Sequence, residues 1–199
     1  MRIGLFGGTF NPPHAGHIAL AKSAVKELSL SKLLLMPAFI PPHKPLPPGS
    51  ADAEERFEMT ALAAESIPGG EASRLELQRE ERSYTVDTLR ELREIYPEDE
   101  IFLIVGGDMF LSLDHWFRAQ EIFRLARIAA AAREEEELPL LEKQKGELER
   151  RFSARVTLLS HRVLRVSSSE IREAVARGGE CPLLPERIRE YIRERKLYL

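Results

Sequence analysis

Glycine and histidine residues follow the first short apolar segment of the chain. Ile3–Phe6 runs directly into Gly7 and Gly8, and His14 and His17 come soon after. Glycine lets a phosphate oxygen approach the backbone, and an imidazole N–H can donate a hydrogen bond to that oxygen. The pattern therefore indicates a site for a polyphosphate. Its candidate phosphate contacts are Gly7, Gly8, Thr9, Phe10, His14 and His17.

The spacing of His14 and His17 predicts that both rings lie on one side of a helix. If helical structure begins near Ala15, residues three apart share a face at the positive end of the helix dipole. Both rings could then donate to one polyphosphate, with Gly16 keeping the approach open. A lone His-x-x-His pair would favour capping or core histidines, or two ligands of a metal ion, but the Gly-Gly turn before this pair favours phosphate contact.

The stretch Gly7–His17 differs from two common phosphate-binding motifs. It matches neither G-x-G-x-x-G, which binds dinucleotides, nor the P-loop G-x-x-x-x-G-K-[ST]. The sequence therefore indicates neither hydride transfer nor P-loop hydrolysis.

A second group of phosphate-binding candidates lies near the C-terminus. Ser167–Ser169 precede Arg172 at the start of an expected helix. Their hydroxyls, the first backbone N–H groups and the guanidinium could bind β- and γ-phosphates. Ser167 and Glu170 also have the spacing of a capping box, and capping and phosphate binding can coexist.

Two isolated charged residues are further candidates. Six of the 13 prolines lie between Pro37 and Pro48, which predicts a long loop. Lys44 in this loop could swing over bound phosphates or could be an ordinary solvated lysine. Asp108 follows Gly106 and Gly107, where it could contact a nucleotide or simply form a turn.

Short apolar segments alternate with stretches of helical spacing along most of the chain. The expected strands are Ile3–Phe6, Lys32–Met36, Arg74–Leu77, Ile101–Val105, Ala126–Ala132 and Arg155–Leu159. The expected helices are Ile18–Leu28, Ala53–Ser66, Thr85–Ile95, Phe117–Leu125, Leu138–Phe152, Ser169–Ala176 and Pro185–Arg195, with the acidic run Glu134–Glu137 beginning a solvated helix. This alternation predicts an α/β fold: a Rossmann-like doubly wound parallel sheet that positions ligands at the carboxyl ends of its strands. We expect a single domain over residues 1–199, with a small C-terminal helical appendix from about residue 167 to residue 199.

Composition narrows the class of protein. The chain has 199 residues, 43% of them hydrophobic, which is enough for one sizeable core. Its net charge of -3 argues against a nucleic-acid partner. The single cysteine, Cys181, excludes an internal disulfide, and no apolar run approaches the length needed to span a membrane. We therefore expect a cytoplasmic protein without a membrane partner. The sequence leaves the oligomeric state open, including a homo-oligomer.

Taken in chain order, these stretches resemble the nucleotidyltransferase superfamily with the His-x-Gly-His motif, which His14–His17 match. Pro37–Lys44 is similar to the proline-rich loop of that superfamily, which ends in Pro-Pro-His-Lys. The other matching blocks are Ser83–Leu89, Gly106–Asp108 with Trp116 downstream, and Ser167–Arg172. Five blocks in this order resemble the bacterial nicotinate-nucleotide adenylyltransferase family over nearly the whole chain.

The resemblance implies transfer of AMP from ATP to nicotinate mononucleotide, with nicotinate adenine dinucleotide and pyrophosphate as products, as a step of NAD biosynthesis. Mg²⁺ is expected to enter on ATP rather than in a protein cage. His17 would act at the α-phosphate, assisted by three further catalytic residues, His14, Lys44 and Arg172. The remaining implied ATP contacts are Gly106, Asp108, Ser167, Ser168 and Ser169.

The resemblance also implies a set of acceptor contacts. They are Lys44, Tyr84, Thr85, Trp116 and Arg133, with Trp116 stacking on the pyridine ring. Tyr84 and Thr85 begin an expected helix, whose N–H groups favour a carboxylate over an amide, because an amide would need an acceptor as well. Arg133 is followed by Glu134–Glu137, where the family usually has Pro-Gly.

Other functions remain open. Adenylyl transfer to nicotinamide mononucleotide or to phosphopantetheine would use the same ATP site. A nucleotide-sensing or RNA-binding module could keep the fold without turnover. A His-ligated metalloenzyme is disfavoured, because the chain has one cysteine and no His-Glu-x-x-His spacing.

Overall fold

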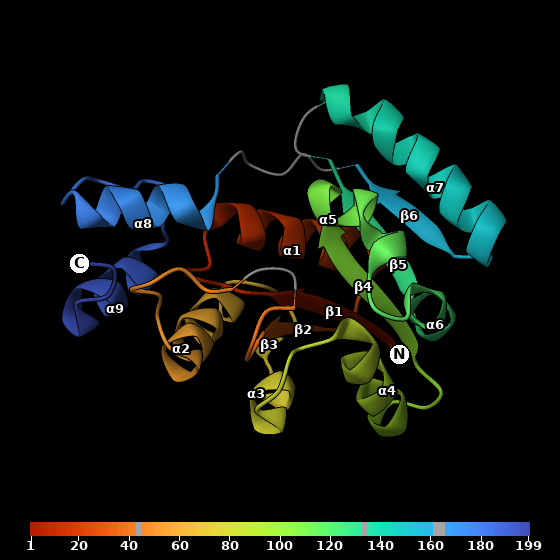
Figure 1. The fold of residues 1–199 in the computed structure, drawn as a ribbon, viewed down its shortest axis with the longest axis horizontal. Coiled ribbons are helices and arrows are strands. Elements are labelled where there is room, and N and C mark those ends of the chain that lie inside the picture. Colours follow the sequence, from red (N-terminus) through yellow and green to blue (C-terminus); the bar gives the residue numbers. More distant parts are fainter. Residues whose placement is uncertain (43–44, 133–134, 161–165) are drawn as a thin grey trace.

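The computed structural model of the chain describes residues 1–42, 45–132, 135–160 and 166–199. At its centre is a six-stranded parallel sheet with the strand order β3-β2-β1-β4-β5-β6 (Figure 1). The strands are β1 (Arg2–Gly8), β2 (Lys32–Pro37), β3 (Gly70–Ala72), β4 (Glu100–Gly106), β5 (Arg127–Ala131) and β6 (Val156–Leu159). This is the order of a doubly wound sheet, so the expected α/β, Rossmann-like fold is confirmed.

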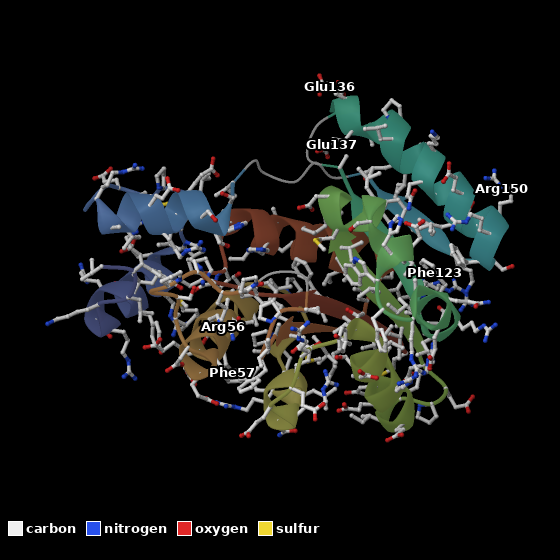
Figure 2. All side chains as sticks on the ribbon, viewed as in Figure 1. Arg56, Phe57, Phe123, Glu136, Glu137 and Arg150 are labelled. Carbon is white, nitrogen blue, oxygen red and sulfur yellow. The ribbon has the colours of Figure 1, made fainter. Side chains whose placement is uncertain are left out.

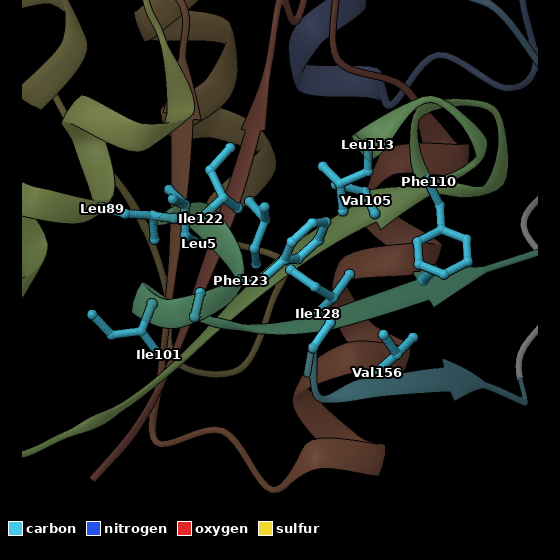
Figure 3. Packing of buried hydrophobic residues seen from close by; sticks show 14 of the residues in the cluster. Leu5, Leu89, Ile101, Val105, Phe110, Leu113, Ile122, Phe123, Ile128 and Val156 are labelled. Carbon is cyan, nitrogen blue, oxygen red and sulfur yellow. The ribbon is translucent and has the colours of Figure 1, made fainter. Parts of the chain in front are cut away.

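Helices cover both faces of the sheet. The connecting helices are α1 (Ala15–Leu28), α2 (Ala53–Ala64), α3 (Leu75–Arg79), α4 (Thr85–Ile95), α5 (Gly107–Leu111), α6 (Ala119–Leu125) and α7 (Leu138–Phe152), with short 3-10 turns η1 (Leu113–His115) and η2 (Glu135–Glu137). Apolar residues of α4, α6 and α7 pack on one face, and those of α1 pack on the other. Figure 3 shows Leu89, Ile122 and Phe123 beside the strand residues Leu5 and Ile128.

The strands are apolar on both sides because both faces of the sheet are buried. In β2, Leu34 and Met36 join the core beneath α4, whereas Leu33 and Leu35 join the core beneath α1. A near-continuous apolar run is typical of a parallel strand in such a layered fold. This feature made the central strands recognisable in the sequence.

The last two helices, α8 (Ser168–Ala176) and α9 (Glu186–Arg195), lie at the end of the molecule opposite α7, with α9 beside α2 (Figure 1). A separate apolar cluster holds them there, in which Met59 of α2 packs with Ile171 and Ile188. Among the helices that the structure describes, none is long and apolar enough to cross a bilayer.

One expected strand is wrong. Arg74–Leu77 alternates charged and apolar residues like a strand, but Leu75–Arg79 forms α3. The true edge strand is Gly70–Ala72, which pairs with β2 from Leu33 to Leu35. Its sequence, Gly-Glu-Ala, has no apolar alternation, so the pairing that creates it is not visible locally. The sequence also gave no indication of α5.

Candidate nucleotide and acceptor site

The candidate site lies at the carboxyl ends of two neighbouring parallel strands, from which the chain continues to opposite faces of the sheet. β1 pairs with β4 in parallel, with Leu5 opposite Leu103, so Gly8 and Gly106 end their strands at the same edge. The chain leaves β1 for α1 on one face and leaves β4 for helices that pack on the other face. Such a switch point is where doubly wound sheets bind ligands.

His14 and His17 form a reciprocal cap at the start of α1. His14 is the N-cap residue, and its Nδ1 accepts a hydrogen bond from the backbone N–H of His17 at 3.4 Å. The Nδ1 atom of His17 accepts from the backbone N–H of His14 at 3.2 Å. The two rings stack with their centroids 3.7 Å apart. Both imidazoles therefore lie on one side of the chain, held by the backbone itself.

These caps determine which ring nitrogen carries the proton. A nitrogen that accepts a hydrogen bond cannot carry a hydrogen, so each neutral ring is protonated on Nε2. The two Nε2–H groups are the donors that this arrangement can direct at a phosphate. His17 is half-buried, whereas only 6% of the His14 surface is exposed, so His17 is the more accessible ring.

Two backbone N–H groups at the start of α1 already have hydrogen-bond partners and are not available to a phosphate. The N–H of Ala15 donates to the carbonyl of Leu183 at 2.9 Å, and the N–H of His17 is taken by His14. The candidate phosphate donors here are therefore mainly the imidazoles rather than a row of free backbone N–H groups. Gly7 leaves its side of the strand end open, because a Cβ at that position would have no neighbour within 4 Å.

Phe10 packs against the histidine pair on its buried side. It is buried at 1% exposure, and its ring meets the ring of His17 edge-on with centroids 5.1 Å apart. Its φ of +48° is in the left-handed region, which is uncommon for a residue with a side chain. Gly8 makes room for it, since a Cβ there would lie 3.1 Å from the Phe10 ring. Phe10 thus contributes packing and position to this turn.

The start of α8 lies against the same loop. Arg172 donates to the carbonyl of Asn11 at 2.7 Å and to the hydroxyl of Ser169 at 3.1 Å. The hydroxyl of Ser168 donates to the carbonyl of Pro12 at 2.9 Å. Ser167 and Glu170 form the capping box that their spacing indicates. The structure therefore brings Ser168, Ser169 and Arg172 to the loop that joins β1 to α1 (residues 9–14), which we call the histidine loop.

The side chain of Asn11 joins its loop to two distant parts of the chain. Its side-chain oxygen accepts from the hydroxyl of Tyr198 at 2.8 Å and from the backbone N–H of Ala51 at 3.2 Å. Its amide donates to the hydroxyl of Ser50 at 2.8 Å. The residue is 2% exposed, so its part is to hold the histidine loop in place.

The candidate acceptor residues gather around the start of α4. Tyr84 is the N-cap residue, Thr85 begins the helix, and no side chain in the described structure caps this first turn. The ring of Tyr84 lies 4.7 Å from that of Phe117, which follows Trp116 directly. Phe117 is 51% exposed, and Trp116 packs against the core. An aromatic surface thus lies beside a helix N-terminus, which suits a flat anionic ring.

Asp114 fixes the segment that carries Trp116. Its carboxylate accepts from Gln144 at 3.1 Å and Arg151 at 3.0 Å, both on α7. Burial raises the pKa of this carboxyl, but the hydrogen bonds from Arg151 and Gln144 outweigh burial, and the net effect is a lowered pKa. The ionised form therefore anchors η1 to α7.

Glu76 is buried against Ser83 and Thr88, at the start of α4 where the candidate acceptor residues lie. It is 5% exposed and accepts a hydrogen bond of 2.6 Å from Thr88 of α4. Burial raises its pKa to about 7, and hydrogen bonds from Thr88 and Ser83 and the charge of Arg79 only partly oppose this effect. This carboxyl therefore titrates near neutral pH.

Of the three remaining candidates, Asp108, Lys44 and Arg133, the structure describes only Asp108. Asp108 is exposed in the first turn of α5, with its carboxylate folded toward Gly106. Lys44 and Arg133 lie outside the described residues. Glu135 and Glu136 of the turn η2 are exposed, as expected for a solvated start of α7 (Figure 2). The carboxylate of Glu137 instead lies near Gly107 at the start of α5, and Glu134 lies outside the described residues.

Sequence reasoning missed Glu76, Asp114 and Arg56. A signal existed for Arg56, which occupies a core-facing position of α2 in helical register with Met59 and Ala63. A charged residue in an apolar stripe is a reason to look for buried partners. Glu76 and Asp114 offered no comparable signal, because their partners come from other elements.

Together the doubly wound sheet and the glycine-histidine loop define a protein of the nucleotidyltransferase class. The family model described as Cytidylyltransferase-like matches residues 5–174. A relative from Exiguobacterium sibiricum is 38% identical over 199 residues, covering 100% of this chain and 99% of the relative. A second, from Moorella thermoacetica, is 40% identical and covers 99% of this chain and 91% of the relative. Both are named probable nicotinate-nucleotide adenylyltransferase, and the chain belongs to that family.

The fold agrees with a solved structure as well. Nicotinic acid mononucleotide adenylyltransferase of Plasmodium falciparum, complexed with NaAD, superposes with a TM-score of 0.75. The match covers 99% of this chain and 97% of the other at 17% sequence identity, so it supports the fold alone.

The pKa of Glu76 makes stability depend on pH. Its pKa is about 7 in the folded state and near the ordinary value of 4.5 when unfolded, so the folded state binds more protons between these values. The free energy of unfolding should therefore fall as the pH rises from 5 to 8, by up to about 3 kcal/mol from this group. Glu76→Gln should lose this part of the fall. Urea unfolding of both proteins at pH 5 and pH 8 measures it, and an identical pH dependence would contradict the assignment.

Proposed function

We propose that this protein transfers the AMP group of ATP to nicotinate mononucleotide, producing nicotinate adenine dinucleotide and pyrophosphate. The observation that carries the proposal is the stacked His14 and His17 pair beside Gly7 and Gly8, at the switch point of a doubly wound sheet. Membership of the nicotinate-nucleotide adenylyltransferase family supports the choice of substrates.

The chemistry needs no protein base. The second pKa of a phosphate monoester is about 6, so the acceptor phosphate is largely dianionic near neutral pH. Its oxygen attacks the α-phosphorus of ATP in line, a new P–O bond forms, and the bond to the β-phosphate oxygen breaks to release pyrophosphate. Catalysis then consists of holding two anions together and stabilising the charge that develops on the transferred group.

The residues divide this task. His17, the more accessible ring, donates from Nε2 to the α-phosphate, and His14 orients it through the reciprocal cap. Arg172 and the hydroxyl of Ser169 meet the outer phosphates, whereas the hydroxyls of Ser167 and Ser168 donate to Glu170 and to the carbonyl of Pro12 and hold the start of α8 in place. Gly7–Thr9, the backbone of Phe10, Gly106 and Asp108 line the nucleotide. Lys44 is assigned to the phosphates from its sequence position. Mg²⁺ enters as part of the ATP substrate, because it keeps several waters and needs few protein ligands.

The acceptor lies against α4. The uncapped start of the helix at Tyr84 and Thr85 receives the nicotinate carboxylate, and Trp116 lies along the pyridine ring. A carboxylate accepts only, which suits backbone N–H donors, whereas the nicotinamide amide would leave its own donors unsatisfied there. Arg133 is an additional acceptor contact proposed from its sequence position.

A pyrophosphate-release assay with alternative acceptors tests the proposed reaction. With ATP and Mg²⁺, nicotinate mononucleotide should give the highest kcat/KM, ahead of nicotinamide mononucleotide and phosphopantetheine. A clear preference for either of these would overturn the choice of acceptor. Pyrophosphate release with none of the three would instead favour a nucleotide-binding module without turnover.

Replacing His17 with alanine tests its role at the transferred phosphate. Loss of one preorganised donor should lower the single-turnover rate by about 10²–10³. The matched control is Lys26→Ala, because that side chain is exposed in the last turn of α1, at the opposite end of the helix from His17, and it should keep the wild-type rate. Unchanged chemistry in a folded His17→Ala protein would remove the assignment.

A further inference from the structure

Arg56 is the most deeply buried charged side chain near the candidate site. It projects from α2 (Figure 2) and is 1% exposed. Among the described residues no carboxylate forms an ion pair with it, and its Nε has no hydrogen-bond partner. Burial lowers its pKa, and the carboxylate of Asp52 only partly opposes that effect. Burying a cation without an ion-pair partner lowers the free energy of unfolding, so packing alone does not account for an arginine at this position.

The guanidinium contacts backbone carbonyls from two separate loops. Its NH1 group donates to the carbonyl of Thr9 at 3.0 Å, directly after β1, and to that of Ala38 at 2.5 Å, directly after β2. Its NH2 group donates to the carbonyl of Phe39 at 3.1 Å. One rigid planar group therefore sets the separation of these two loops.

Each of the two loops leads to a different substrate of the proposed reaction. The first continues through Phe10 to the histidine pair. The second is bound to the acceptor segment: the N–H of Phe39 donates to the hydroxyl of Ser83 at 2.9 Å, and the N–H of Ser83 donates to the carbonyl of Ile40 at 3.0 Å. Ser83 comes immediately before Tyr84, the N-cap of α4.

We propose that Arg56 is a positioning residue of the transfer reaction. It holds the loop after β1, which leads to the histidine pair, and the loop after β2, which binds Ser83, at the separation that in-line attack requires. The inference rests on the proposed function. Arg56 touches neither substrate, so it acts through the carbonyls of Thr9, Ala38 and Phe39. Displacement of reacting groups by about 1 Å can cost on the order of 100-fold in rate, even when each substrate still binds.

The test separates positioning from binding and from folding. Arg56→Lys keeps the positive charge, but one ammonium cannot reproduce the fork that spans both loops. Its single-turnover rate at saturating ATP and nicotinate mononucleotide should fall by about 10–100-fold. The dissociation constants for ATP alone and for nicotinate mononucleotide alone, measured by calorimetry, should change by less than about threefold, because the contacts to each substrate remain.

Ser83→Ala provides a second variant that leaves Arg56 unchanged. It removes the acceptor for the Phe39 N–H, and it should reduce the rate in the same way but by a smaller factor. Because Ser83 also hydrogen-bonds Glu76, the rate of Ser83→Ala is compared with that of Glu76→Gln. Arg74→Met is the matched control, since Arg74 binds Glu54 of α2 at 2.6 Å and contacts neither loop. It should keep the wild-type rate even if its melting temperature falls.

Two results would overturn the proposal. One is a folded Arg56→Lys protein that reacts at the wild-type rate. The other is a loss of rate that follows the melting temperature across all four variants, including Arg74→Met, which is the behaviour of a purely structural residue. Failure of the proposed function is distinguishable, because the wild-type protein itself would then form no nicotinate adenine dinucleotide in the same assay.

Discussion

The reciprocal hydrogen bonds between His14 and His17 are the interaction on which the account of this protein depends. Each ring accepts a backbone N–H of the other residue through Nδ1, so neither ring can turn without leaving a polar group of the helix start unsatisfied. A helix cap therefore also fixes the tautomer. Two stacked rings with Nε2–H donors can stabilise a transferred phosphate without reorganising during the reaction.

Distant elements of the chain hold the loop that carries this pair. Arg172 binds the loop from α8, Tyr198 binds it from the C-terminus, and Arg56 binds it from α2. The apolar cluster shared by α2, α8 and α9 supports all three. The C-terminal helices thus stabilise the histidine loop as well as completing the fold.

The parts predicted from sequence are those that local periodicity or local spacing encodes. Thr85–Ile95 and Leu138–Phe152 were expected as helices with the bounds that the structure has. The edge strand Gly70–Ala72 was not, since only its pairing with β2 makes it a strand. The same limit applies to the site: His14 and His17 are only three positions apart, whereas Arg56 meets Thr9 only after the sheet has formed. Long-range contacts of this kind leave little trace in a single sequence.

The most direct measurement is ¹⁵N NMR of the histidine side chains during titration with ATP. Without ligand, both rings should show an unprotonated Nδ1 and a protonated Nε2. ATP should shift the Nε2 resonances of His14 and His17 and leave those of His115 unchanged, because the exposed ring of His115 contacts Asp114 beside the acceptor residues and not the histidine pair. Saturation with ATP that leaves both Nε2 resonances in place, or a free protein with the proton on Nδ1, would contradict the account.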